Sequence, residues 1–184
     1  MILYSHVLYE RLAPWLSVFE RRLPHREIDS TLQEGDRADV LLTGLGRYGA
    51  ALAEQLRQRG CRLLGVDFDP GAVEQHARDG YRVHYGDAED PEFVATLPLA
   101  HADWVVSTVR DPDVNRMLLH GLRQQNYPGK VAIATSSARE ARRFEAEGVD
   151  LVLIPYADAA REAACRLVPA ARRPAQPENA HEAI

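Results

Sequence analysis

The sequence predicts an α/β fold, a doubly wound parallel sheet of six strands in the order 3-2-1-4-5-6. Short apolar runs alternate with amphipathic segments between residues 38 and 168, which is the pattern of strands joined by crossover helices. A glycine-rich turn, Gly44 to Gly49, follows the first apolar run and opens the first helical segment. An acid, Asp67, ends the second run. Right-handed crossovers around such a turn favour this strand order, which is Rossmann-like.

The expected elements alternate regularly along this region. Because short apolar runs are separated by helical segments, the strands should be parallel and covered on both faces. Asp69-Pro70 fits a helix start, and Gly60, Gly80 and Gly148 fit the left-handed residue that ends many helices. Strands are expected near residues 39–43, 62–66, 81–85, 103–108, 130–134 and 151–154. Helices are expected near residues 47–59, 70–79, 90–97, 111–124, 138–147 and 156–168.

Two segments flank this region. Residues 1–22 carry apolar side chains at steps of three, four and one, so an N-terminal amphipathic helix is expected there, and Pro14 would kink or restart it. Residues 23–37 are polar and predict a linker. The composition of residues 171–184 predicts a disordered tail. The expected organisation is therefore a connector helix and linker at 1–37, an α/β domain at 38–170 and a tail at 171–184.

The composition is typical of some classes of protein and disfavours others. With 184 residues, 46% hydrophobic and 27% charged, one globular domain is expected. The formal net charge of −5 disfavours nucleic acid as the main partner, because a phosphate backbone calls for a basic surface. Two widely separated cysteines, Cys61 and Cys165, are typical of a reduced, cytoplasmic protein. No apolar run reaches the roughly 18 residues of a membrane span, and the first residues lack the features of a secretion signal.

The glycine turn predicts a binding site for an adenine nucleotide. Gly44 allows the tight turn, Gly46 lets a phosphate approach the backbone, and Gly49 lets helix and strand pack closely. Free backbone N–H groups at the start of the helix attract an anion. Asp67, at the expected spacing of roughly 20 residues, can accept hydrogen bonds from ribose hydroxyls. The same carboxylate repels a 2′-phosphate, which disfavours NADP.

The other strand ends bring further candidates to the same edge of the sheet. Arg47 could bond a phosphate or lie in solvent, and Tyr48 could pack on the ligand or on the next strand. Phe68 could flank the adenine. Asp87 could accept from the adenine amino group, with Ala88 supplying a backbone N–H. The expected ligand contacts are Gly44, Leu45, Gly46, Arg47, Tyr48, Asp67, Phe68, Asp87, Ala88, Thr108, Val109 and Arg110.

Several residues near strand ends have a second interpretation as helix starts. Asp69 precedes Pro70 and is more simply a helix cap. For Asp87 a cap and an adenine acceptor are equally good interpretations. The segment from Thr108 to Arg110 could face the ribose or a phosphate, whereas Arg110-Asp111 could be an ordinary helix start.

The sequence offers little for catalysis. The seven histidines form no metal-ligand spacing, so no metal site is expected. No serine lies in a nucleophile elbow. The only lysine, Lys130, follows a Pro-Gly turn after Tyr127, which is the wrong spacing for a catalytic Tyr–Lys pair. A binding module without catalytic residues is favoured. The alternatives are a small NAD-dependent oxidoreductase with an unrecognised active site and, more weakly, a methyltransferase.

Several segments together resemble the N-terminal nucleotide-binding half of RCK domains, also called KTN or TrkA-N domains. The resemblance covers residues 41–160. Residues 4–22 also resemble the connector that follows the last membrane helix of Kef-type cation:proton antiporters, although a generic amphipathic helix docking on its own domain is the alternative. The segments that carry the domain resemblance are Gly44–Gly49, Val66–Pro70, Tyr85–Ala88, Arg142–Phe144, Glu147–Asp150 and Leu153–Tyr156.

The resemblance implies a regulatory protein. RCK domains usually dimerise, bind NAD(H), AMP or ATP without chemistry, and shift a gate. The chain is therefore expected to be the cytoplasmic regulatory part of a Kef-type antiporter, on the same or a separate chain, that controls potassium or other monovalent-cation transport at the inner face of the membrane. The small, apolar face of residues 156–168 could cross to a partner subunit or pack within its own chain. The implied ligand contacts are Gly44, Gly46, Arg47, Asp67, Asp87 and Thr108.

Overall fold

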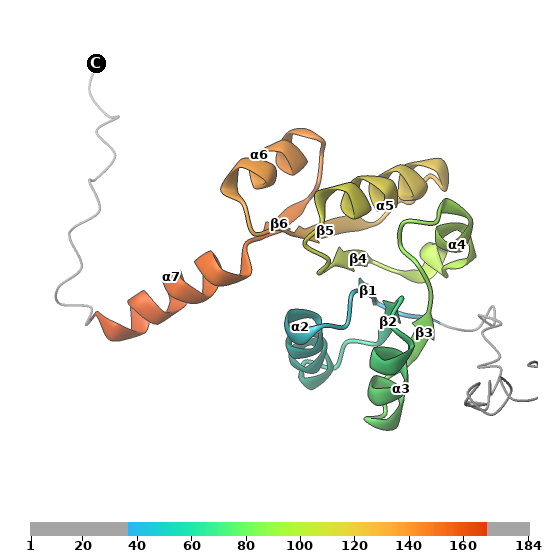
Figure 1. The fold of residues 1–184 in the computed structure, drawn as a ribbon, viewed down its shortest axis with the longest axis horizontal. Coiled ribbons are helices and arrows are strands. Elements are labelled where there is room, and N and C mark those ends of the chain that lie inside the picture. The colour runs from blue at the N-terminus through green and yellow to red at the C-terminus, as the bar shows by residue number, and fades with distance from the viewer. Residues whose placement is uncertain (1–36, 169–184) are drawn as a thin grey trace, which may run out of the picture. The chain divides into compact units, whose positions relative to one another are not determined.

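The computed structural model describes residues 37–168 and shows a parallel sheet between two layers of helices (Figure 1). The six strands lie in the order β3-β2-β1-β4-β5-β6, and every neighbouring pair is parallel. The predicted Rossmann-like α/β fold is confirmed. The strands are β1 (Val40–Thr43), β2 (Leu63–Asp67), β3 (Val83–Tyr85), β4 (Trp104–Ser107), β5 (Lys130–Ala134) and β6 (Leu151–Leu153).

The helices also follow the prediction, with ends that differ by one residue at most. The sequence pattern missed a short 3₁₀ helix, η1 (Leu99–His101). The predicted amphipathic helix at residues 1–22, the linker and the tail from residue 171 lie outside the described residues. The observed helices are α2 (Arg47–Gln58), α3 (Pro70–Arg78), α4 (Pro91–Thr96), α5 (Pro112–Gln124), α6 (Ala138–Ala146) and α7 (Pro155–Leu167).

Helices α3, α4 and α5 each begin at an Asp-Pro pair. Asp69, Asp90 and Asp111 are the N-caps of α3, α4 and α5, and each carboxylate accepts a hydrogen bond from the backbone N–H two residues further on. Proline fits the first helical position because its missing N–H would have no partner there. The cap interpretation is therefore confirmed for Asp69, and Asp111 starts α5. It is wrong for Asp87, because Asp90 caps the helix that follows β3.

The sheet separates two apolar cores. Helices α2 and α3 cover one face, and α4, α5 and α6 cover the other (Figure 1). The larger core lies on the α5 side and includes Leu41, Leu118 and Phe144, which are fully buried. The smaller core includes Leu42 and Ala53 on the α2 side. Burying both faces fixes the register of the strands, because a slip of one residue would exchange the two sets of side chains.

Glu54 links helix α2 to the residues that precede β3. Its carboxylate accepts a hydrogen bond from the Tyr81 hydroxyl at 2.5 Å, and further bonds from Gln58 and Arg57. The guanidinium of Arg57 also stacks over the Tyr81 ring, 4.7 Å from its centroid. These bonds, that from Tyr81 first, lower the pKa of Glu54 from 4.5 to about 2.

Glu54 should make the stability of the domain depend on pH. Because its pKa is lower in the folded state, its contribution is complete above pH 4.5 and is lost as the pH falls toward 2. We expect Glu54→Gln to flatten the pH dependence of the free energy of unfolding across this range, measured by urea denaturation. Glu74→Gln is the control, because the partner of Glu74 among the described residues is an exposed arginine, Arg78, on the same helix α3. An equally steep dependence in both variants and the wild type would contradict the prediction.

Candidate functional site

The glycine turn leads from β1 into α2 in a conformation that requires two of its glycines. Gly44 has a φ of +84°, and a Cβ atom there would lie 2.9 Å from Oγ1 of Thr108. A Cβ atom on Gly49 would lie only 1.9 Å from the carbonyl oxygen of Gly44. The first turn of α2 therefore packs directly on the backbone of the turn, which places the start of the helix at the carboxyl edge of the sheet.

Helix α2 begins without a side-chain cap. Its N-cap is Gly46, and its first turn contains no acid, whereas aspartates cap α3, α4 and α5. Gly46 is exposed, and a Cβ atom built on it would meet nothing within 4 Å. The start of α2 therefore has room beside Gly46, and a helix N-terminus whose first N–H groups have no side-chain cap is the arrangement that receives an anion.

Asp67 lies beside this turn and helps to hold it. The side chain is buried, and Oδ2 accepts a hydrogen bond from the N–H of Leu45 at 2.5 Å. Oδ1 accepts from the N–H of Asp69 at 2.9 Å. Since an ionised carboxylate has about four acceptor positions, both oxygens can still accept from a ligand. Asp67 therefore combines an organising role in the turn with free acceptor capacity at the edge of the sheet.

A groove of about 50 Å³ runs over the ends of β1, β2 and β3. Phe68 is 68% exposed at its rim, and Oδ1 of Asp87 accepts a bond from the N–H of Glu89. The structure brings half of the predicted contacts into this groove: Gly44, Asp67, Phe68, Asp87, Ala88 and Val109. Its other lining residues are Thr43, Val66, Gly86, Glu89 and Val114.

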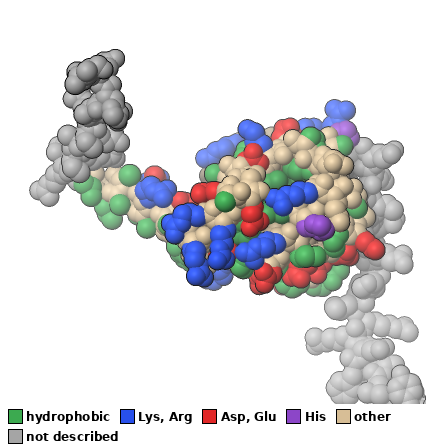
Figure 2. Space-filling model, turned by 90° about the horizontal axis from the view of Figure 1, so that it is seen from above, with side chains coloured by type: hydrophobic (Ala, Val, Ile, Leu, Met, Phe, Trp, Pro, Cys, Tyr) green, Lys and Arg blue, Asp and Glu red, His purple; other side chains and the backbone are tan. Residues whose placement is uncertain are grey.

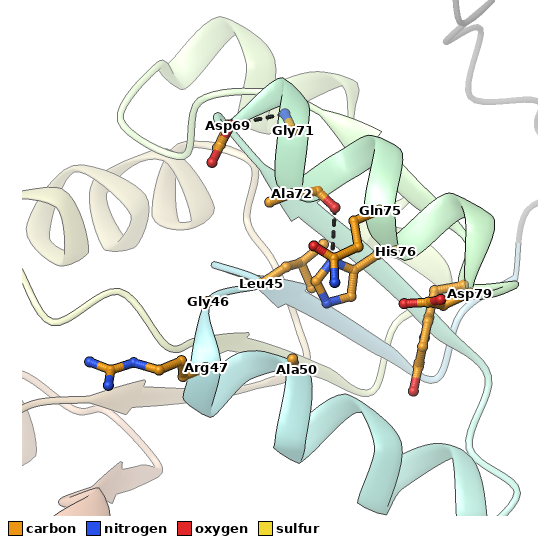
Figure 3. Close-up of a pocket in the computed structure, with 11 residues that line it drawn as sticks. Leu45, Gly46, Arg47, Ala50, Asp69, Gly71, Ala72, Gln75, His76 and Asp79 are labelled. Carbon is orange, nitrogen blue, oxygen red and sulfur yellow. Dashed lines mark hydrogen bonds between the residues drawn. The ribbon is translucent and has the colours of Figure 1, made fainter.

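A second cavity, of about 620 Å³, lies between α2 and α3 (Figure 3). Three predicted contacts, Leu45, Gly46 and Arg47, line it where it meets the glycine turn. The guanidinium of Arg47 points away from His76 in the middle of the cavity (Figure 3). His76 is buried, and its Nδ1–H donates to the carbonyl of Ala72 at 2.8 Å. The sequence prediction missed the α3 wall, formed by Ala72, Gln75, His76 and Asp79, although their helical spacing signals one shared face.

Three predicted contacts line neither space. Thr108 donates from Oγ1 to the carbonyl oxygen of Gly44 at 2.6 Å, so its hydroxyl braces the turn. Tyr48 is half-buried, and burial, followed by the charge of Asp158, raises its pKa. Arg110 is exposed. The prediction also missed Asn115, which is fully buried on α5.

The described residues contain no group of three or more histidines, cysteines or acids that could hold a metal ion. Within residues 37–168, no helix has both the length and the apolar character needed to cross a membrane.

The sheet order, the uncapped glycine turn and the acid that ends β2 are together the features of a Rossmann-like domain. A family model described as the TrkA-N domain matches residues 40–155. The chain belongs to the TrkA-N family, and the predicted resemblance to RCK domains is confirmed.

Solved structures share this fold. An NAD(P)-binding domain of an exopolyphosphatase-related protein from Archaeoglobus fulgidus is 26% identical, covers 71% of this chain and 97% of its own, and has a TM-score of 0.63. The TrkA-N domain of the inner membrane protein ybaL from Escherichia coli is 22% identical, with coverages of 72% and 99% and a TM-score of 0.64. The AMP-bound C-terminal domain of Kef from Shewanella denitrificans is 21% identical, with coverages of 71% and 82% and a TM-score of 0.58. The last two likenesses show the fold alone.

Proposed function

We propose that this chain is a nucleotide-sensing regulatory domain that binds an adenine nucleotide (AMP, ATP or NAD(H)) without consuming it. The observation that carries the proposal is the uncapped start of α2 at Gly46, directly beside the groove that Asp67 and Phe68 line. The N–H groups would receive a phosphate, and the Asp67 carboxylate would accept from the ribose hydroxyls. Phe68, Asp87 and Ala88 would contact the adenine.

The regulatory part of the proposal concerns monovalent-cation transport by a Kef-type antiporter. It is supported by membership of the TrkA-N family and by the fold shared with a Kef C-terminal domain. Residues 1–37 would connect the nucleotide-binding domain, 38–170, to the membrane part on the same or a separate chain, at the cytoplasmic face. A nucleotide would shift the transporter only by binding its two states with different affinity.

We also propose that the domain works as a homodimer through α7. None of the residues of this helix is buried, and Figure 2 shows apolar side chains on its surface. Tyr156 is 69% exposed and Leu167 is 80% exposed. Covering such an apolar surface with a partner removes it from water, which lowers the free energy of the complex. Analytical ultracentrifugation of the wild type and Leu167→Asp tests this, and an unchanged monomer–dimer equilibrium would oppose it.

The ligand and the absence of turnover can be tested on the purified protein. Mass spectrometry of small molecules released by heat should identify a bound adenine nucleotide, and calorimetric titration should rank AMP, ATP and NAD(H). The alternative, a small NAD-dependent oxidoreductase, is kept because a 26% identical neighbour is described as an NAD(P)-binding domain. Catalytic loss of NADH absorbance with candidate oxidants would favour that enzyme. Failure to bind any adenine nucleotide would refute the proposed sensing function.

Asp67→Ala should weaken nucleotide binding by about 1–3 kcal/mol, the cost of losing hydrogen bonds to a charged group. Calorimetric titration with AMP and NAD measures this effect. Asp150→Ala is the matched control, because Asp150 also accepts from a backbone N–H, that of Val131 at 2.8 Å, but at the opposite edge of the sheet. Affinity in Asp67→Ala equal to that of the control would remove Asp67 from the site.

A further inference from the structure

A polar residue interrupts the apolar face of helix α5. Asn115 has no exposed surface, and it lies on the same buried face as Leu118, Leu119 and Leu122. Burial of an amide costs free energy unless its polar atoms find partners. Within residues 37–168, no group donates a hydrogen bond to Oδ1. The hydrogen bonds by which this side chain stabilises the fold are therefore those that its Nδ2 group donates.

Nδ2 of Asn115 holds the loop that follows β4. It donates to the carbonyl oxygen of Val109 at 2.8 Å, and it lies 3.5 Å from the carbonyl oxygen of Ala134 at the end of β5. Val109 is the second residue after β4 ends at Ser107. The amide group of Asn115 thus holds this loop against α5 and connects it to the end of the neighbouring strand, β5.

The same loop packs on the glycine turn. Thr108 donates from its backbone N–H to the carbonyl oxygen of Thr43 at 2.9 Å, and from Oγ1 to that of Gly44 at 2.6 Å. A Cβ atom on Gly44 would lie 3.1 Å from Cγ2 of Val109. Hydrogen bonds and close contact therefore run in series from Asn115 through Val109 and Thr108 to Gly44, across the switch point of the sheet.

From this series of contacts we propose that Asn115 is a positioning residue for the nucleotide site, which it supports without contacting the ligand. The inference rests on the proposed nucleotide binding. N–H groups at the start of α2 bind a phosphate well only if they are already held in place, since ordering them on binding costs affinity. Asn115 holds them through the loop at Thr108 and Val109, so loss of its donor should loosen the glycine turn.

Asn115→Leu is the test variant, because leucine fits a buried helical face and brings no polar atom of its own, while the carbonyl oxygen of Val109 loses the donor that Asn115 supplies. We expect it to weaken the binding of AMP and of NAD by roughly tenfold, about the effect of one hydrogen bond. Asn115→Gln, which keeps the amide donor, should restore part of the affinity. Leu118→Ala is the control, because it removes packing on the same face of α5 and should lower the melting temperature without changing the affinity measured well below it.

Hydrogen exchange in the protein without nucleotide tests the same inference independently. In Asn115→Leu, the backbone N–H of Thr108, which bonds to Thr43, should exchange at least about fivefold faster than in Leu118→Ala. Unchanged nucleotide affinity in Asn115→Leu, or exchange of Thr108 no faster than in the control, would overturn the positioning role. If the wild type binds no nucleotide, the proposed function fails, and the exchange experiment still decides whether Asn115 holds the turn.

Discussion

Replacing Gly49 by alanine is expected to lower the free energy of unfolding by about 2–3 kcal/mol. Alanine normally favours a helix over glycine by about 1 kcal/mol, so the expected sign is opposite to the usual one. The reason is the 1.9 Å separation between a Cβ atom on Gly49 and the carbonyl oxygen of Gly44. The obstacle is backbone, which a change of side-chain rotamer cannot relieve, so α2 would have to move away from the turn.

Urea denaturation measures this effect, and the turn itself supplies the control. Gly46→Ala makes the same substitution three residues earlier, where a Cβ atom meets nothing within 4 Å and φ is −63°. Its stability should stay within about 1 kcal/mol of the wild type. A Gly49→Ala protein as stable as Gly46→Ala would show that helix and turn are not packed as closely as the structure indicates.

The fold could be predicted from the sequence because its determinants are local. Each residue of β1 is buried, and the four-residue run Val40–Thr43 is apolar apart from its last member, so the pattern shows a strand covered on both faces. The Asp-Pro pairs before α3 and α5 show the helix starts directly. The right-handed crossover rule then leaves few strand orders. The 3₁₀ helix at Leu99–His101 was missed because three residues are too short to show a period.

The candidate site was predicted less completely because its geometry depends on segments far apart in the sequence. The bond from Thr108 to Gly44 joins residues that are 64 positions apart, and no local pattern reveals that this hydroxyl faces the protein. The cap interpretation of Asp87 was wrong because the helix begins three residues later, at Asp90-Pro91. This Asp-Pro pair was a stronger helix-start signal than Asp87. Asn115 did leave a signal, since its helical spacing from Leu118, Leu119 and Leu122 places it on a buried face, and buried polar groups are as a rule hydrogen-bonded.

Replacing Gly46 by leucine should weaken the binding of AMP and NAD by about 100-fold while the protein remains folded. The backbone conformation at Gly46, with φ of −63° and ψ of −172°, is open to any residue, and the side chain would project into empty space. Gly46 is the N-cap of α2, and the N–H groups that follow it are those proposed to bind the phosphate. Loss of one or two hydrogen bonds to a charged phosphate, about 1.5–3 kcal/mol each, gives the expected magnitude.

Calorimetric titration of a graded series at this position separates steric obstruction from damage to the fold. Gly46→Ala should bind more weakly than the wild type and more tightly than Gly46→Leu, because a methyl group blocks less of the approach, while all three proteins should unfold within about 1 kcal/mol of one another. Gly46 also lines the cavity between α2 and α3. Titration of Gln75→Ala, on the opposite wall of that cavity, therefore shows whether the cavity itself takes part in nucleotide binding. If Gly46→Leu binds nucleotide as tightly as the wild type, the turn serves only to connect β1 to α2, and the phosphate of any ligand must bind elsewhere.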